Sequence, residues 1–289
     1  VPNQKAADVR LRSIISSPQW TKSGEPLPFA IGKDISGHAV IGELNKMPHL
    51  LIAGQTGSGK SVCINTILGS MLLTRSPHDV KMILVDPKMV ELQPFSSIPH
   101  LLLPVVTDAR KAANVLAWVC EKMEGRYELL KDAGVKNIKG FNSLGEKKVR
   151  ERLGDGFVED RTPRHLPYIV VVVDEMADLM MVSKKEAEQA ITRLAQKSRA
   201  VGIHVILATQ RPSTDVITGV LKGNLPTRIA FQVTSKIDSR VILDEGGADK
   251  LLGSGDMLYK PPGSNKMLRV QGAFIDDEED LQHIIDHVK

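Results

Sequence analysis

Residues 54–61 read GQTGSGKS and match the phosphate-binding pattern G-x-x-x-x-G-K-[ST]. Glycines in such a loop let backbone N–H groups approach phosphate oxygens without interference from a Cβ atom. Lys60 then reaches the β and γ phosphates, the Ser61 hydroxyl is a ligand for Mg²⁺, and the following helix adds its positive end. We therefore expect ATP and Mg²⁺ as cofactors, bound by Gly54, Gln55, Thr56, Gly57, Ser58, Gly59, Lys60, Ser61 and Val62.

Two carboxylates end another apolar stretch, YIVVVVDE, which closes with Asp174 and Glu175. Ligands of open α/β sheets bind at the carboxyl ends of the strands. Asp174 is placed to hold Mg²⁺ together with Ser61, and Glu175 is placed to orient and polarise an attacking water. The alternative for this pair is a plain exit from a strand into a turn. Gln210, which ends IHVILATQ, is a candidate sensor of the γ phosphate, with stabilisation of a turn as its alternative.

Elements that could position these residues recur along the chain. Apolar runs without alternation are typical of strands buried on both faces of a parallel sheet. They occupy residues 50–53, 81–88, 168–175, 203–210 and 228–233. Asp86 and Lys88 end the second run in the same layer, and the sequence favours a site role and a structural role there equally.

Helical patterns lie between the runs. Apolar spacing predicts a helix over residues 108–132 that stops at Gly134. Ser183 and Glu186 form a capping-box pattern for a second helix, which we expect to continue to Arg199. The predicted fold is therefore α/β, with a mainly parallel sheet and helices on both faces.

Composition is that of an ordinary globular protein, with 42% hydrophobic and 25% charged residues in 289, and a net charge of +4. Only 4% of residues are aromatic, which disfavours a base-stacking platform for single strands. No apolar run approaches the ~20 residues that span a bilayer.

We expect an N-terminal partial or connecting segment over 1–35 and one ATPase domain over 36–289, in which about 141–167 form a charged surface loop.

An ordered series of motifs resembles the FtsK/SpoIIIE family of bacterial DNA translocases. The series comprises GQTGSGKS, DPKMVEL, IVVVVDEMADLM, ILATQRPST, SKIDSR, GSGDMLY and VQGAF, and covers roughly residues 30–275. The resemblance implies a RecA-like motor that hydrolyses ATP, forms a homo-hexameric ring and drives double-stranded DNA through its centre. It also implies chromosome segregation at cell division, with septal division or recombination proteins as partners through other parts of the protein. The parent protein would be anchored at the cytoplasmic face of the bacterial membrane.

Residues 211–240 concentrate positive charge, because they hold five cations and two carboxylates. Ser235 and Asp238 form a capping pattern that places Lys236 and Arg240 in the first turns of a helix. Cations are disfavoured there by ~0.3–1 kcal/mol each, and a nearby phosphate backbone reverses that sign. Solvated surface charges are the alternative. The candidate DNA-binding residues are Arg211, Lys222, Lys236 and Arg240.

A motor ring also requires an arginine that reaches the neighbouring subunit's γ phosphate. Arg193 and Arg199 are the candidates, and the family resemblance favours Arg199. Its alternative role is to satisfy the dipole at a helix end. Three other functions stay open for the chain: a related conjugative or plasmid-transfer DNA pump, a P-loop kinase or small-molecule ATPase, and a non-hydrolysing nucleotide-gated assembly or DNA-binding module.

Overall fold

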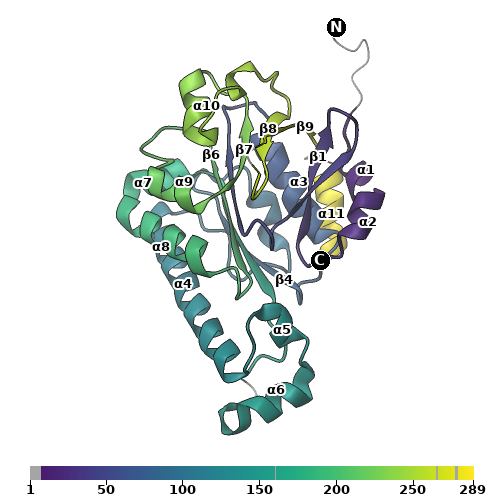
Figure 1. Ribbon diagram of the computed structural model, residues 1–289, viewed down its shortest axis with the longest axis vertical. Coiled ribbons are helices and arrows are strands. Elements are labelled where there is room, and N and C mark those ends of the chain that lie inside the picture. Colours follow the sequence, from purple (N-terminus) through teal and green to yellow (C-terminus); the bar gives the residue numbers. More distant parts are fainter. Residues whose placement is uncertain (1–7, 160, 265, 277–278) are drawn as a thin grey trace.

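The computed structural model describes residues 8–159, 161–264, 266–276 and 279–289. Within these residues one sheet has the strand order β2-β1-β9-β8-β7-β3-β6-β5-β4 (Figure 1). The five strands predicted from the apolar runs are adjacent and parallel, which confirms that prediction. They are β3 (His49–Ala53), β4 (Val80–Val85), β5 (Tyr168–Val173), β6 (Ile203–Thr209) and β7 (Thr227–Phe231).

Four further strands extend the sheet with antiparallel pairing and were not predicted. They are β1 (Pro28–Asp34), β2 (Ala39–Glu43), β8 (Asp256–Lys260) and β9 (Leu268–Gly272). Because β1 pairs with both β2 and β9, the boundary expected near residue 35 does not separate two sheets. Residues 1–7 of the expected N-terminal segment lie outside the described residues.

Helices cover both faces of the sheet, as predicted (Figure 1). One face carries α1 (Leu11–Ile15), α2 (Pro18–Ser23), α3 (Lys60–Leu72) and α11 (Asp280–Val288). The other carries α4 (Ala109–Asp132), α7 (Met176–Val182), α8 (Lys184–Lys197) and α9 (Gly219–Asn224). Strand β5 shows how the sheet divides two cores, because Val170 and Val172 belong to the first and Val171 and Val173 to the second.

Further elements include α10 (Lys236–Leu243) and the 3₁₀ turns η1 (Gln93–Ser97), η2 (Gly154–Gly156) and η3 (Ala248–Lys250). Helix α10 follows β7 at the carboxyl end of the parallel strands. Among the described residues, no helix combines the length and apolar character needed to cross a bilayer.

The long helix was predicted correctly at both ends. Asp108 caps α4 by accepting a hydrogen bond from the Lys111 N–H (2.9 Å), and Gly134 takes a left-handed φ of +63° just beyond it. The predicted capping box at Ser183 was wrong, because this side chain makes no capping hydrogen bond. Ser183 instead joins α7 directly to α8, and its N–H donates to the Leu179 carbonyl.

The expectation of a loop over 141–167 was also wrong in part. Helices α5 (Ile138–Asn142) and α6 (Gly145–Leu153) form a lobe at the far end of α4 (Figure 1). Val149 is the buried residue of α6, and Glu146 and Arg150 pair one helical turn apart on it. One apolar anchor and such charge pairs hold a helix that composition alone does not reveal.

Candidate functional site

The phosphate loop, residues 54–61, joins β3 to α3 at the carboxyl edge of the sheet. Gly57 and Gly59 adopt φ values of +76° and +109°, which side chains rarely tolerate. A Cβ atom on Gly59 would also lie 2.6 Å from the Gly255 nitrogen. That nitrogen donates to the Ser58 carbonyl at 3.0 Å, so the turn before β8 packs against the loop and fixes its shape.

Lys60 and Asp174 form a buried ion pair behind the loop. The Lys60 Nζ donates to Asp174 Oδ1 at 2.6 Å and to the Asp174 carbonyl at 2.9 Å. Their side chains are only 2% and 1% exposed. Burying such a pair costs desolvation energy that mutual attraction only partly offsets. Asp174 thus holds the Lys60 ammonium group at the site, and a phosphate oxygen could take the place of this carboxylate as its partner.

Two buried polar atoms at this place have no hydrogen-bond partner among the described residues: Asp174 Oδ2 and Ser58 Oγ. Unpaired buried oxygens cost about 1–3 kcal/mol each, and both belong to residues next to Lys60: Ser58 lies two positions before it and Asp174 is its ion-pair partner. The half-buried Ser61 stands in the first turn of α3 next to Lys60. A carboxylate and a hydroxyl are ligands that suit Mg²⁺, so the donor set fits the predicted ion.

Glu175 is fully buried and accepts hydrogen bonds from four donors. Its Oε1 accepts from Thr209 Oγ1 (2.6 Å) and the Ala177 N–H (3.2 Å). Its Oε2 accepts from the Gln210 N–H (3.1 Å) and Lys88 Nζ (3.3 Å). Burial raises the pKa of Glu175, but these hydrogen bonds and the Lys88 charge outweigh burial and hold the pKa below its usual value. The carboxylate is therefore ionised and held in one orientation.

Gln210 connects this carboxylate to the phosphate loop. Its side-chain Oε1 accepts from Thr56 Oγ1 at 3.0 Å, while its N–H donates to Glu175. Gln210 also lines a cavity of about 1080 Å³ that runs along the loop to Gln271 and Phe274. This volume accommodates a nucleoside triphosphate.

Several residues of this site were not selected from the sequence. Lys88 was only an open alternative, and the structure brings it to Glu175. Thr209 was part of a strand run and donates to the same carboxylate. Gln232 holds Gln55 through both its carbonyl (2.9 Å) and its side chain (3.0 Å). The sequence signal that could have identified Lys88 and Thr209 was their position at the carboxyl ends of predicted strands, where ligands bind.

The candidate DNA-binding residues lie beyond β6 and β7. Ser235 caps α10 as predicted, because its hydroxyl accepts from the Asp238 N–H at 3.1 Å. Lys236 and Arg240 are exposed on that helix, and Arg211 is exposed after β6. Lys222 differs from these three cations, because its Nζ bonds Asp244 at 2.8 Å.

Arg199 lies two residues after α8 and before β6, at the amino edge of the sheet. Its side chain is exposed and its Nε donates to the Asn45 carbonyl at 3.3 Å. The whole of β6 separates it from Thr209 and the phosphate loop of the same chain. Arg193, the other candidate, pairs with Glu124 across α8 and α4 at 2.8 Å.

Comparison with known proteins gives consistent matches. The DNA translocase FtsK of Oceanobacillus iheyensis is 58% identical over 287 residues, which cover 99% of this chain and 36% of that protein. The DNA translocase SpoIIIE of Bacillus subtilis is 54% identical over 288 residues, covering 100% of this chain and 36% of that protein. The chain thus spans little more than a third of the length of these curated relatives.

Solved structures show the same fold. The pCW3 conjugation coupling protein TcpA, determined as a monomer with ATPγS, has a TM-score of 0.76 at 26% identity, covering 99% of this chain and 75% of that one. ATPases 2 and 3 of EssC from Geobacillus thermodenitrificans have a TM-score of 0.78 at 20% identity, covering 100% of this chain and 52% of that one. The predicted RecA-like P-loop fold is confirmed.

The model of the FtsK/SpoIIIE family matches residues 10–214, which include the phosphate loop, Asp174, Glu175 and Gln210. The sequence resemblance, the fold and the arrangement of the site therefore agree, and the chain belongs to the FtsK/SpoIIIE family.

Proposed function

We propose that this chain is the ATP-hydrolysing motor of a double-stranded DNA translocase that acts in bacterial chromosome segregation at cell division. The observation that carries the proposal is the ionised, fully buried Glu175, held by four donors beside the Lys60–Asp174 pair. A family member that only binds nucleotide needs no carboxylate oriented in this way. The names of the two curated relatives support DNA as the substrate.

The residues of the site divide the work of hydrolysis. On nucleotide binding, Lys60 exchanges the Asp174 carboxylate for phosphate oxygens, and the phosphate loop N–H groups surround the same phosphates. Asp174 and Ser61 would hold Mg²⁺, which supplies charge neutralisation on the β and γ phosphates. Glu175 orients the attacking water and accepts its proton, and Gln210 contacts the γ phosphate from the next strand.

Assembly as a homo-hexamer is part of the proposal. Arg199 faces solvent at the edge of the sheet opposite its own phosphate loop, so it reaches a γ phosphate only in a neighbouring subunit. The exposed Arg211, Lys236 and Arg240 would contact the DNA backbone, and phosphate contacts suit a motor that runs over any sequence. Lys222 stays a candidate, but its Nζ is already paired with Asp244, which also binds Arg228.

The setting of the whole protein is likewise proposed from the family. We infer a parent protein anchored at the cytoplasmic face of the membrane, with septal division or recombination proteins as partners of its other regions. A conjugative or plasmid-transfer pump is the second candidate, since TcpA is a conjugation coupling protein of the same fold. The higher identity to the DNA translocases FtsK and SpoIIIE, 58% and 54% against 26%, favours the first.

Steady-state ATPase assays with and without long double-stranded DNA test the proposal. We expect DNA to stimulate hydrolysis several-fold, and we expect Lys60→Ala to abolish turnover with and without DNA because the phosphate charge loses its buried partner. Lys197→Ala, on the exposed end of α8, is the matched control and should retain the parent rate. An ATPase rate that is the same with and without DNA would favour a small-molecule ATPase. Full activity of a folded Lys60→Ala variant would refute the site assignment.

A further inference from the structure

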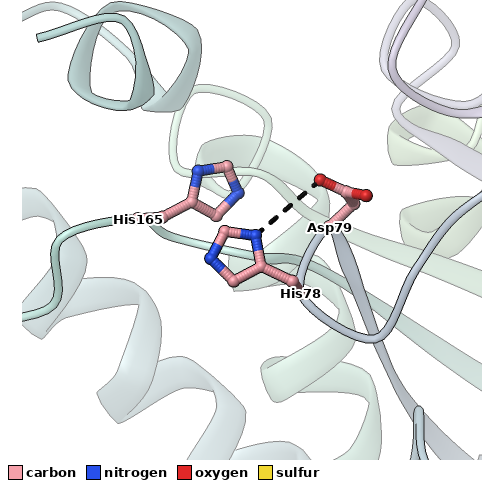
Figure 2. A group of neighbouring side chains, drawn as sticks. All are labelled: His78, Asp79 and His165. Carbon is pink, nitrogen blue, oxygen red and sulfur yellow. Dashed lines mark ion pairs between the residues drawn. The ribbon is translucent and has the colours of Figure 1, made fainter. Parts of the chain in front are cut away.

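A second cluster of polar side chains lies at the amino edge of the sheet, opposite the phosphate loop. His78 and Asp79 occupy the turn before β4, and His165 lies just before β5 (Figure 2). The donor atoms of the three side chains lie within 4.8 Å of one another. In the part of the chain that the structure describes, no other group of three His, Cys, Asp or Glu side chains does so. The proposed ATPase mechanism uses none of them.

The backbone already holds the two segments that carry these side chains. The Tyr168 N–H donates to the Asp79 carbonyl at 2.8 Å, which joins the strands at this end. Asn142, the last residue of α5, exchanges two hydrogen bonds of 2.9 Å with the backbone of Leu166. A site on such anchored backbone is preorganised, since its segments need no further ordering to bring the ligands together.

The Asp79 carboxylate is oriented toward the histidines (Figure 2). The Ser76 hydroxyl donates to its Oδ2 at 2.6 Å, and its other oxygen, Oδ1, lies 4.0 Å from His78 Nδ1. The Ser76 hydrogen bond keeps the pKa of Asp79 below its usual value, although burial opposes it. A carboxylate held at one oxygen and open at the other matches the way outer hydrogen bonds orient metal ligands.

Each of the two imidazoles offers one nitrogen as a ligand atom. Their rings stack with centroids 4.2 Å apart and planes inclined by 24°. Ligand atoms on a tetrahedral zinc ion lie about 3.3 Å apart, given bonds of about 2.0–2.1 Å. His78 is 71% exposed, so its ring can rotate to close the group to that separation.

We propose that His78, Asp79 and His165 bind one divalent transition-metal ion, for which Zn²⁺ is the best match, with water completing the coordination shell. Imidazole suits zinc and its first-row neighbours, whereas Mg²⁺ prefers oxygen ligands alone. The ion bonds the turn before β4 to the segment that returns from α5 and α6. Binding therefore cross-links the α5–α6 lobe to the sheet, at a distance from the ATPase chemistry.

Calorimetric titration of the metal-stripped chain with Zn²⁺, in millimolar Mg²⁺ to protect the nucleotide site, tests the proposal. We expect one ion per chain, and a rise in Tm because zinc binds only the folded site. His78→Ala and His165→Ala should each weaken binding at least tenfold and remove the zinc-dependent rise in Tm. His38→Ala is the matched control, because His38 pairs with Asp34 at 3.5 Å at the surface without a second histidine.

The exposed position of His78 keeps the test decisive, since His78→Ala removes a ligand without disturbing the core. Circular dichroism and the zinc-free Tm verify that each variant is folded. Co²⁺ serves as a second probe, and the parent chain but not His165→Ala should give the visible absorption of nitrogen-ligated cobalt. Absence of zinc binding by the parent chain, or binding that survives in both histidine variants, would overturn the proposal.

Discussion

Replacement of Glu175 by glutamine is expected to damage both turnover and folding in this chain. The carboxylate accepts from Thr209 Oγ1 and the Ala177 N–H at one oxygen, and from the Gln210 N–H and Lys88 Nζ at the other. All four neighbours are donors in this arrangement, and a glutamine amide offers one acceptor oxygen and one donor NH₂ group. Whichever way the amide turns, its NH₂ group faces two donors.

The cheaper orientation places the NH₂ group toward Thr209, whose hydroxyl can rotate to accept. The Ala177 N–H then loses its partner, at about 1–3 kcal/mol for a buried donor. Loss of the carboxylate charge also weakens the Lys88 contact, by about 0.5–1 kcal/mol after allowance for the 36% exposure of Lys88. Glu175→Gln should thus lower the free energy of unfolding by about 1.5–4 kcal/mol. It should lower turnover by about 10²–10⁴-fold, because the general base is lost.

Urea unfolding without nucleotide measures the first quantity and steady-state ATPase the second. Nucleotide binding should persist, because Lys60 is untouched. Glu128→Gln, the same chemical change on the exposed face of α4, should leave the free energy of unfolding within about 0.5 kcal/mol of the parent and the ATPase rate unchanged. Lys88→Met should destabilise the parent chain but cost less in the Glu175→Gln background, as expected of contacting residues. Unchanged stability would refute the four-donor arrangement, and a parent rate of hydrolysis would refute the role of Glu175 as the base.

Three further outcomes are expected. Burial lowers the pKa of His49 to about 3 and that of His204 to about 4, so below pH 6.5 the unfolded chain takes up protons that the folded chain excludes. The free energy of unfolding should therefore fall by about 2 kcal/mol per histidine between pH 7 and pH 5. A urea midpoint that does not change over this range would contradict the burial of these histidines. Lys236→Ala with Arg240→Ala should reduce the log–log salt slope of DNA binding by about one to two at unchanged basal ATPase, whereas an unchanged slope would place the DNA path elsewhere. Arg199→Ala should bind ATP but hydrolyse it poorly. Rings that mix Arg199→Ala with Glu175→Gln subunits should regain some activity, and an absence of rescue would show that Arg199 does not act in trans.

The parallel strands and the phosphate loop could be predicted because their signals are local. A run such as residues 168–173 is apolar throughout and is followed directly by two charged residues. The phosphate loop carries its binding groups in eight consecutive residues. Strand β9 gave no such signal, since only Val270 among its five residues is buried. The pattern at Ser183 matched a capping box, yet the direct junction of α7 and α8 decided its conformation. Local patterns fail where neighbouring elements fix the backbone.

The partners of Glu175 depend on the order of strands, which the sequence did not specify. In the parallel ladders Val173 pairs with Leu207 of β6 and with Val85 of β4. Continuing these registers by two residues brings Glu175 beside Thr209, and Lys88 follows within reach on the other side. Once β5 is known to lie between β4 and β6, both contacts follow from residue numbers.

Under the proposed function, this strand order also brings the hydrolytic site and a candidate DNA contact together. Thr56 of the phosphate loop bonds the Gln210 side chain, and the Gln210 N–H bonds Glu175. The next residue is Arg211, a candidate DNA contact, whose N–H donates to Thr209 Oγ1 at 3.0 Å. The γ phosphate, the attacking water and a DNA phosphate would therefore all act on one turn after β6. Because Thr209 bonds both Glu175 and Arg211, a change at Glu175 would reach the turn that carries the candidate DNA contact through two hydrogen bonds, without requiring a long chain of intermediates.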